Sequence, residues 1–251
     1  MNIALIGYGK MGHAIERFAI SRGHNIVARI DKDNRADFDS VGFLSADVAI
    51  EFSTPSTAVA NYLECFKRGI KVVSGTTGWT SAMPQIKAMC ENGKNTFFWA
   101  SNFSLGVNIF FALNRYLSTM MERAADDGDN RSPYAAEITE VHHIHKLDHP
   151  SGTAITIAEG IGHTNRFYNR GWGEEEQSLQ DRQVLIRHRR EGEVPGTHIV
   201  KWHSPVDEII IEHKAHSRDG FALGAVKAAE WVNIHTGFLT MPQMMAHIID
   251  F

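Results

Sequence analysis

A glycine-rich turn between a strand pattern and a helix pattern constrains this fold more than any other feature of the sequence. Residues 3–6 form an apolar run typical of a strand that is buried on both faces. The residues that follow match G-x-G-x-x-G, and residues 13–21 continue with a helical pattern. A second strand pattern at residues 25–30 completes the unit. This order of elements predicts the opening of a dinucleotide-binding α/β fold.

The turn and the end of the second strand carry the first predicted cofactor contacts. The first glycine permits a tight turn, the second lets the backbone approach a pyrophosphate, and the third lets helix and strand pack closely. The N-terminus of the helix favours an anion. An acidic residue is expected about 20 residues further on, and Asp31 stands there. The NAD(P)-binding residues predicted in this part are Gly7, Tyr8, Gly9, Lys10, Met11, Gly12, Asp31 and Lys32.

The choice between NADH and NADPH stays open on these residues. Asp31 favours NADH because its charge would repel a 2′-phosphate, whereas Lys32 could pair with that phosphate. The segment between Asp31 and the next strand pattern, at residues 47–52, leaves little room for a full crossover helix. We therefore expect an adenine side that is open or unusually built.

Strand and helix patterns keep alternating up to residue 100. Further strands are expected at residues 47–52, 71–74 and 96–100, and helices at residues 56–68 and 83–92. This alternation predicts a Rossmann-type, doubly wound parallel sheet with helices on both faces. Ligands bind outside the carboxyl ends of such strands. The loops after the last two strands supply the remaining predicted cofactor contacts, Gly75, Thr76, Thr77, Ala100, Ser101, Asn102 and Phe103.

The pattern changes after residue 105 and predicts a second, α+β domain. A long amphipathic helix at residues 107–124 precedes strand patterns at 135–141, 183–188, 197–202 and 208–214. Several strands in succession predict an open mixed sheet that is partly antiparallel. We expect a dinucleotide-binding domain (1–104), a substrate-binding and oligomerisation domain (105–217), and a C-terminal helical segment (218–251) that completes the first domain.

The richest group of reactive side chains lies between Glu140 and Thr153. This stretch holds four histidines and a lysine, followed by Ser151-Gly152-Thr153 and a helical pattern. Ser151 fits the N-cap of that helix, and the next two residues could offer N–H groups to a carboxylate. Histidine and lysine can supply positive charge and a proton. A site of this kind suits an anionic substrate that gains a hydride and then a proton.

Two other interpretations of this stretch compete. A zinc site could use the His-x-His pattern and Asp148. Lys146 argues against it, because a cation beside a metal ion is unfavourable, and we expect no metal. A structural role suits His145 or His149 taken singly, but not the whole cluster beside Ser-Gly-Thr.

Composition excludes several classes of partner. The net charge is −4 and no basic block or basic amphipathic stretch occurs, so we expect neither nucleic acid nor a membrane surface as partner. No apolar run approaches the length of a membrane span. Cys65 and Cys90 are expected to be plain thiols, and no signal-peptide pattern precedes residue 3. A cytoplasmic location fits these features.

Together these motifs resemble the 4-hydroxy-tetrahydrodipicolinate (dihydrodipicolinate) reductase family over nearly the whole chain. The most specific part is the His-His-x-His-Lys string with the Pro-Ser-Gly-Thr-Ala string that follows it. Besides the glycine turn, the strings that carry the resemblance are Gly75-Thr76-Thr77-Gly78, Ser101-Asn102-Phe103-Ser104-Leu105-Gly106-Val107-Asn108, His142-His143-Ile144-His145-Lys146, Pro150-Ser151-Gly152-Thr153-Ala154 and His213-Lys214-Ala215-His216-Ser217-Arg218.

The resemblance implies reduction of a small dicarboxylated ring by NADH or NADPH, in the diaminopimelate route to lysine. It implies that His142 is the proton donor and that Lys146 donates a proton or stabilises charge. It implies that His143 contacts the substrate and that Gly152 and Thr153 hold a carboxylate. We predict Ser151, which precedes them, as a further substrate-binding residue. It further implies a homotetramer joined through the sheet of the second domain. Our own mechanistic hypothesis adds that closure of the two domains excludes water from the reacting groups.

Two departures and two rival functions remain. The segment after Asp31 is shorter than in many members, and Thr54 stands where some members carry an arginine, which leaves cofactor preference open. One rival is another small-substrate dehydrogenase on the same fold; an aldehyde dehydrogenase would need a nucleophilic cysteine near the nicotinamide. The other is a non-catalytic NAD(P) sensor, which would bind cofactor and leave the dicarboxylate unreduced.

Overall fold

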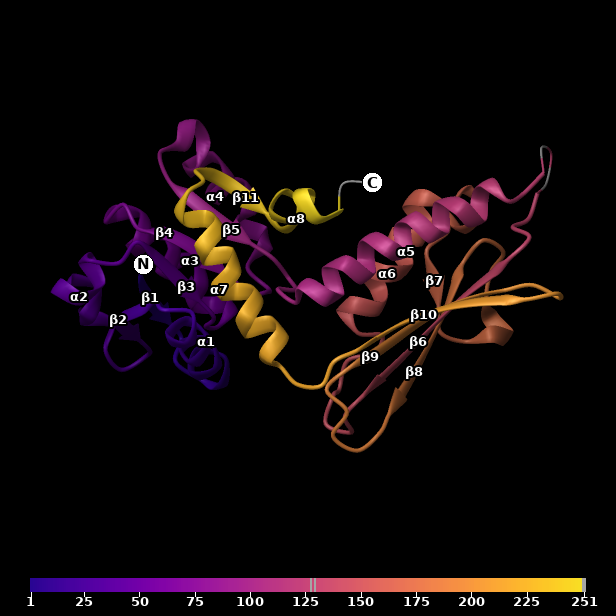
Figure 1. The fold of residues 1–251 in the computed structure, drawn as a ribbon, viewed down its shortest axis with the longest axis horizontal. Helices are drawn as coiled ribbons and strands as arrows, with labels where there is room; N and C mark the ends of the chain where they lie inside the picture. The colour runs from indigo at the N-terminus through magenta and orange to yellow at the C-terminus, as the bar shows by residue number, and fades with distance from the viewer. Residues whose placement is uncertain (127, 129, 250–251) are drawn as a thin grey trace. The chain divides into compact units, whose positions relative to one another are not determined.

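The computed structural model describes residues 1–126, 128 and 130–249, and the chain divides into two compact units (Figure 1). The first unit comprises Met1–Leu105 and the segment from Asp219 onward, and the second comprises Gly106–Arg218. The expected C-terminal segment, 218–251, reaches residues 250 and 251, which lie outside the described residues.

The first unit is built on a parallel sheet in which the strand order is β11-β5-β4-β3-β1-β2. Its strands are β1 (Asn2–Ile6), β2 (Asn25–Ile30), β3 (Val48–Glu51), β4 (Lys71–Ser74), β5 (Thr96–Trp99) and β11 (Gly237–Thr240). Every neighbouring pair among them is parallel. The central strands β1 and β3 are almost wholly buried, which explains why they read as continuous apolar runs.

Helices cover both faces of this sheet, as predicted. Alternate residues of β1 face opposite sides: Ile3 and Leu5 pack with α1 and α7, whereas Ala4 and Ile6 pack with α3. The helices of this unit are α1 (Lys10–Ser21), η1 (Arg35–Asp39), α2 (Val41–Leu44), α3 (Pro55–Lys67), η2 (Thr80–Ala82), α4 (Met83–Met89), η3 (Glu91–Gly93), α7 (Asp219–Asn233) and α8 (Met241–Ile249). The Rossmann-type prediction is therefore confirmed.

Two local expectations for the first unit need correction. The C-terminal segment is not wholly helical, because β11 adds a parallel strand beside β5 in the register Gly237↔Thr96. Four residues without an alternating pattern gave no strand signal of their own. The helix expected at residues 83–92 ends at Met89 and continues as the short η3 turn, which leads into Gly93 at φ +68°. The short segment after Asp31 does lack a full crossover helix.

The second unit holds a mixed sheet in the order β10-β9-β6-β8-β7. The strands β6, β9 and β10 pair antiparallel, whereas β8 joins β6 and β7 in parallel. The elements are α5 (Leu105–Arg123), β6 (Ala135–His142), α6 (Gly152–Thr164), η4 (Arg166–Tyr168), β7 (Trp172–Gly173), η5 (Glu176–Ser178), β8 (Val184–Arg190), β9 (Thr197–His203) and β10 (Glu208–Lys214). The helices α5 and α6 cover one face of this sheet around a core centred on Trp202 (Figure 1).

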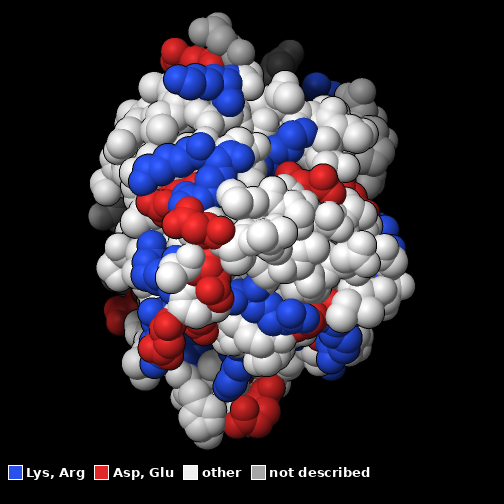
Figure 2. Space-filling model, turned by 90° about the vertical axis from the view of Figure 1, so that its left-hand side faces the viewer, with Lys and Arg blue, Asp and Glu red and all other residues white. Residues whose placement is uncertain are grey.

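Charge on the surface is mixed rather than segregated. Basic and acidic side chains lie interspersed on the face that Figure 2 shows, in keeping with the net charge of −4. Among the described residues, no helix combines the length and the apolar character that crossing a membrane requires.

Candidate active site

The three glycines of the turn in the first unit differ in their surroundings: Gly7 and Gly12 pack closely against backbone, whereas Gly9 faces open space. Gly7 lies at φ +87°, and a Cβ there would stand 2.0 Å from the Phe52 carbonyl oxygen. A Cβ on Gly12 would stand 2.5 Å from the Gly7 carbonyl oxygen. A Cβ on Gly9 would meet no atom within 4 Å, and Gly9 is the N-cap residue of α1, which has no side-chain cap. The helix N-terminus is therefore open where an anion would approach.

A hollow of about 320 Å³ opens beside this turn, at the carboxyl ends of the strands. It brings together five of the predicted cofactor residues, Gly7, Tyr8, Gly9, Asp31 and Lys32. It also contains Thr54, the position where some family members carry an arginine, and polar residues that sequence reasoning missed, namely Arg35, Ser53, Thr57 and Asn61. Arg35 lies on the short helix η1, Ser53 follows β3, and Thr57 and Asn61 lie on α3, so no motif marks them.

Arg35 adds a second cation to the ribose end of this hollow. Its Nη1 donates to Asn61 Oδ1 at 2.9 Å, and its guanidinium lies 5.4 Å from the centre of the Phe38 ring. Asn61 is itself 2% exposed and donates to Ser53 Oγ at 3.2 Å. The Asp31 carboxylate accepts the Lys32 backbone N–H at 2.8 Å. One anion and two cations therefore stand where the adenosine ribose is expected.

The loops after β4 and β5 support the hollow without lining it. Thr76 Oγ1 accepts the Ser53 backbone N–H at 2.9 Å, and a Cβ on Gly75 would stand 2.2 Å from the Phe52 ring. The Phe103 ring lies 5.6 Å from that of Phe52. The predicted residues outside the hollow are Lys10, Met11, Gly12, Gly75, Thr76, Thr77, Ala100, Ser101, Asn102 and Phe103.

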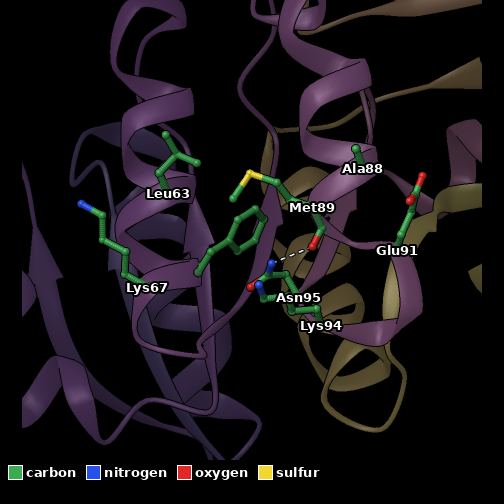
Figure 3. Close-up of a pocket in the computed structure, with 8 residues that line it drawn as sticks. Leu63, Lys67, Ala88, Met89, Glu91, Lys94 and Asn95 are labelled. Carbon is green, nitrogen blue, oxygen red and sulfur yellow. Dashed lines mark hydrogen bonds between the residues drawn. The ribbon is translucent and has the colours of Figure 1, made fainter.

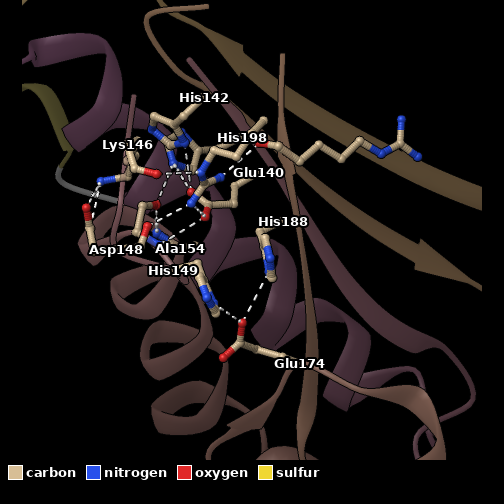
Figure 4. Close-up of polar contacts among 12 residues, drawn as sticks. Glu140, His142, Lys146, Asp148, His149, Ala154, Glu174, His188 and His198 are labelled. Atoms are coloured by element: carbon tan, nitrogen blue, oxygen red, sulfur yellow. Dashed lines mark hydrogen bonds and ion pairs between the residues drawn. The ribbon is translucent and has the colours of Figure 1, made fainter. Parts of the chain in front are cut away.

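In the second unit, a fully buried carboxylate organises the predicted proton donor (Figure 4). Glu140 Oε2 lies 2.9 Å from His142 Nδ1. Its Oε1 accepts the Ser151 backbone N–H at 3.1 Å and Arg190 Nη2 at 3.3 Å. Burial alone would raise the pKa of Glu140, but the contacts with His142 and Ser151 outweigh it and lower this pKa to about 2. The carboxylate therefore stays ionised and holds His142.

Ser151 is buried, and its polar groups are engaged. Its Oγ accepts the Ala154 N–H at 3.2 Å, which confirms the predicted N-cap of α6, and lies 3.1 Å from His198 Nε2. Burial lowers the pKa of His198 to about 3, so this imidazole is neutral near pH 7. Gly152 and Thr153 follow the cap as the first residues of α6, whose N-terminus is favourable to a carboxylate.

The loop that carries Lys146 is held from β8. Lys146 Nζ pairs with the Asp148 carboxylate at 2.7 Å. Arg190 donates to the carbonyl oxygens of Asp148, at 2.7 Å, and Lys146, at 3.2 Å. The same guanidinium also contacts Glu140, so it ties the loop to the buried carboxylate. Arg190 was not predicted, because it lies far along the chain from this loop, within a basic run.

The other histidines of the loop separate into different settings. His143 is half-buried, and its Nδ1 has no hydrogen-bond partner among the described residues. His145 is exposed and pairs with Glu193 at 3.0 Å. The zinc alternative needed histidine beside Asp148, but that carboxylate pairs with Lys146 instead.

A second hollow, of about 550 Å³, lies in the first unit between the ends of α3 and α4 (Figure 3). Its lining is Leu63, Phe66, Lys67, Ala88, Met89, Glu91, Lys94 and Asn95. None of these is a predicted site residue. Asn95 Nδ2 donates to the Met89 carbonyl oxygen at 2.6 Å, which ties the segment before β5 to the end of α4.

Comparison with known proteins identifies a family that matches both units of the chain. The family model for the dihydrodipicolinate reductase N-terminus matches residues 1–103, and that for the C-terminus matches residues 106–245. The 4-hydroxy-tetrahydrodipicolinate reductase of Christiangramia forsetii is 44% identical, with 99% of each chain covered. That of Archaeoglobus fulgidus is 32% identical, covering 98% of this chain and 100% of the relative.

A solved structure shares the fold. It is a dipicolinate-bound dihydrodipicolinate reductase from Paenisporosarcina sp. TG-14, with a TM-score of 0.77 and 18% identity, covering 97% of this chain and 98% of the other. The full-length match to relatives above 30% identity and the two family models lead to one conclusion: this chain belongs to the dihydrodipicolinate reductase family.

Proposed function

We propose that this chain reduces 4-hydroxy-tetrahydrodipicolinate to tetrahydrodipicolinate with NADH or NADPH. The observation that carries the proposal is the second-unit site, where a buried Glu140–His142 pair and Lys146 accompany the N-terminus of α6. Proton donors beside an anion-binding helix end are what reduction of a carboxylated ring requires. Family membership supports the same reaction.

The residues around the glycine turn fit a dinucleotide. The open space at Gly9 and the uncapped start of α1 would receive a pyrophosphate, and the hollow with Asp31 would receive the adenosine ribose. When bound, the nicotinamide supplies the hydride. The tight fits at Gly7 and Gly12 hold the backbone of the turn in the shape that this binding needs.

Unit two would bind the dicarboxylate and supply the proton. We assign one carboxylate to the backbone N–H groups of Gly152 and Thr153, and a further contact to His143, whose Nδ1 is buried without a partner among the described residues. Glu140 engages His142 Nδ1, which leaves Nε2 as the atom that donates a proton. Lys146 stabilises negative charge or donates in its place.

Ser151 acts by positioning in this proposal. Its Oγ caps α6 and contacts His198, and its N–H is taken by Glu140, so it shapes the site without needing to touch the substrate.

The cations near Asp31 favour use of both cofactors. Asp31 suits the ribose 2′-hydroxyl of NADH. Arg35, fixed by Asn61, and Lys32 could hold the 2′-phosphate of NADPH in the same hollow. Thr54 lines this hollow without a charge, and Arg35 supplies the guanidinium that Thr54 lacks.

Assembly through the second-unit sheet is part of the proposal. The edge strand β10 leaves Ile209 and Ile210 43% and 50% exposed. An edge strand with exposed apolar residues suits pairing with another copy, and we propose the homotetramer implied by the resemblance. Sedimentation at micromolar concentration tests it, and a monomer would contradict it. The cytoplasmic location stays a prediction.

An aldehyde dehydrogenase is disfavoured by the cysteines. Cys65 and Cys90 are buried free thiols. Burial raises the pKa of both, that of Cys90 to about 11, so neither is an activated nucleophile.

The deciding experiment follows oxidation of NADH and of NADPH while a synthase generates the substrate in situ. Oxidation that depends on the substrate supports the reductase. Protein that binds cofactor but oxidises neither form would indicate the sensor, and oxidation with a different small substrate would indicate another dehydrogenase.

A further inference from the structure

A group of potential metal ligands lies outside the site described above, on the second unit. His149 precedes α6, Glu174 follows β7, and His188 lies on β8. Both imidazoles face one carboxylate oxygen: Glu174 Oε2 is 2.8 Å from His149 Nδ1 and 3.2 Å from His188 Nδ1 (Figure 4). The two rings stack with their centres 4.3 Å apart. Three segments that are distant in sequence thus converge on one point.

The spacing and chemistry of these atoms suit a transition-metal ion. Zinc binds imidazole nitrogen and carboxylate oxygen at about 2.0–2.2 Å in a tetrahedron. Ligand atoms on that tetrahedron lie about 3.3 Å apart, close to the two nitrogen–oxygen distances here. The three ligand atoms all fall within 4.8 Å of one another. The side chains are 52%, 27% and 35% exposed for His149, Glu174 and His188, so water can complete the coordination.

A second group of similar composition, Glu140, His142 and His198, is a poorer candidate. It is buried, and the Arg190 guanidinium lies 3.3 Å from Glu140, which already supplies a cation to that carboxylate. Among the ion pairs described, Glu174 has only the two imidazoles as partners, and these can lose a proton to the solvent when a metal ion binds.

We propose that His149, Glu174 and His188 bind one divalent transition-metal ion of the zinc class, with water as the fourth ligand. The ion would fasten the loop that carries Lys146 and ends at Ser151 to the β7–β8 side of the sheet. His149 is the only one of the three ligands in that loop, so it makes the link. This site is separate from the proposed chemistry and stands whether or not the chain reduces the dicarboxylate.

The test is titration of the purified full chain with Co²⁺, followed by its visible d–d absorption, and with Zn²⁺ in competition with a chromophoric chelator. We expect one ion per chain in the wild type. His188→Asn and His149→Asn should each weaken binding by about tenfold or more, because each removes a ligand. His163→Asn, which changes an exposed histidine on α6, is the matched control and should leave binding unchanged.

A direct readout of the loop completes the test. Zn²⁺ should slow hydrogen exchange at residues 146–151 in the wild type and not in His188→Asn. Wild-type protein that takes up no metal would overturn the proposal and leave the three side chains as a hydrogen-bonded group. Uptake that persists undiminished in both variants, with circular dichroism showing that they are folded, would overturn it too and place the ion elsewhere, for example at Glu140.

Discussion

The two units bind their proposed ligands with different parts of the chain. The first unit uses its backbone. Its helix α1 starts without a side-chain cap, Gly9 leaves open space for a ligand, and Gly7 and Gly12 allow close packing of the backbone. The second unit uses ionised side chains, with Glu140 at the centre and contacts from β6, β8 and the start of α6. Backbone N–H groups are neutral dipoles that do not titrate, whereas networks of ionised side chains respond to single substitutions and to changes in pH. The difference predicts that substitutions in the second unit lower kcat, whereas substitutions in the first unit weaken cofactor binding.

The largest effect is expected at Lys146. Lys146→Ala should lower kcat by about 10²–10⁴-fold, the usual range for loss of a general acid or its charge. Binding of NADH should be unchanged, because the predicted cofactor contacts lie in the first unit. Steady-state kinetics with cofactor titration by fluorescence checks both. Lys146→Arg, which keeps charge but not the readily released proton, separates the two roles; near-normal turnover of the alanine variant would remove Lys146 from the mechanism.

A smaller loss is expected at the buried carboxylate. Glu140→Gln should lower kcat by about 10²-fold, because His142 loses the partner that orients it. The pH profile of kcat should move as well, since the imidazole no longer faces a carboxylate with a pKa of about 2. A purely structural role for Glu140 would lower Tm and leave the pH profile of the folded fraction unmoved. Glu137→Gln, on the same strand, is the control.

The same contrast explains what sequence reasoning could find. The glycine turn is local, so its spacing predicted β1, α1, β2 and Asp31 together. The His-Lys loop is also local, and the Ser151 cap was predicted from it. The partners Arg190 and Asn61 were missed, because their roles depend on which strands and helices meet in space. The short strands β7 and β11 were missed because two to four residues carry no periodicity.

A matched pair of glycine variants tests the backbone side of the contrast. Gly9→Ala should raise the Kd for both cofactors by about tenfold, ~1.4 kcal/mol, without changing Tm, because its Cβ enters only the open space. Gly12→Ala should also lower stability by about 1–3 kcal/mol, since its Cβ would stand 2.5 Å from the Gly7 carbonyl oxygen. Calorimetric binding and thermal melts measure the two effects. Equal Tm losses in both variants would show that the open space at Gly9 is needed for folding instead.

Arg35 is an exception to the contrast between the units, because it would bind the cofactor through its side chain in a unit that otherwise uses its backbone. Arg35→Ala should raise KM for NADPH by about tenfold, the lower end for loss of a charge-assisted contact at an exposed position. KM for NADH and kcat with either cofactor should stay the same. Arg17→Ala, an exposed arginine elsewhere on the first unit, is the control. An equal rise for both cofactors would place Arg35 on a shared part of the nucleotide.

The smallest effect concerns protons in the second unit. His198 has its pKa lowered by burial to about 3, whereas an unfolded histidine titrates near its ordinary value of 6.5. Between these values the unfolded chain binds the extra proton, so the stability that His198 contributes is complete above about pH 6.5 and falls as pH decreases. From pH 7 to pH 6 this one group should lower the equilibrium constant for folding by about threefold. Glu140 adds nothing in that window, because its carboxylate stays ionised in both states.

Urea unfolding at the two pH values measures this effect. The free energy of unfolding should decrease less from pH 7 to pH 6 for His198→Gln than for the wild type. An identical loss would mean that His198 is protonated in the folded protein, and the Glu140 network would then hold an imidazolium at His198.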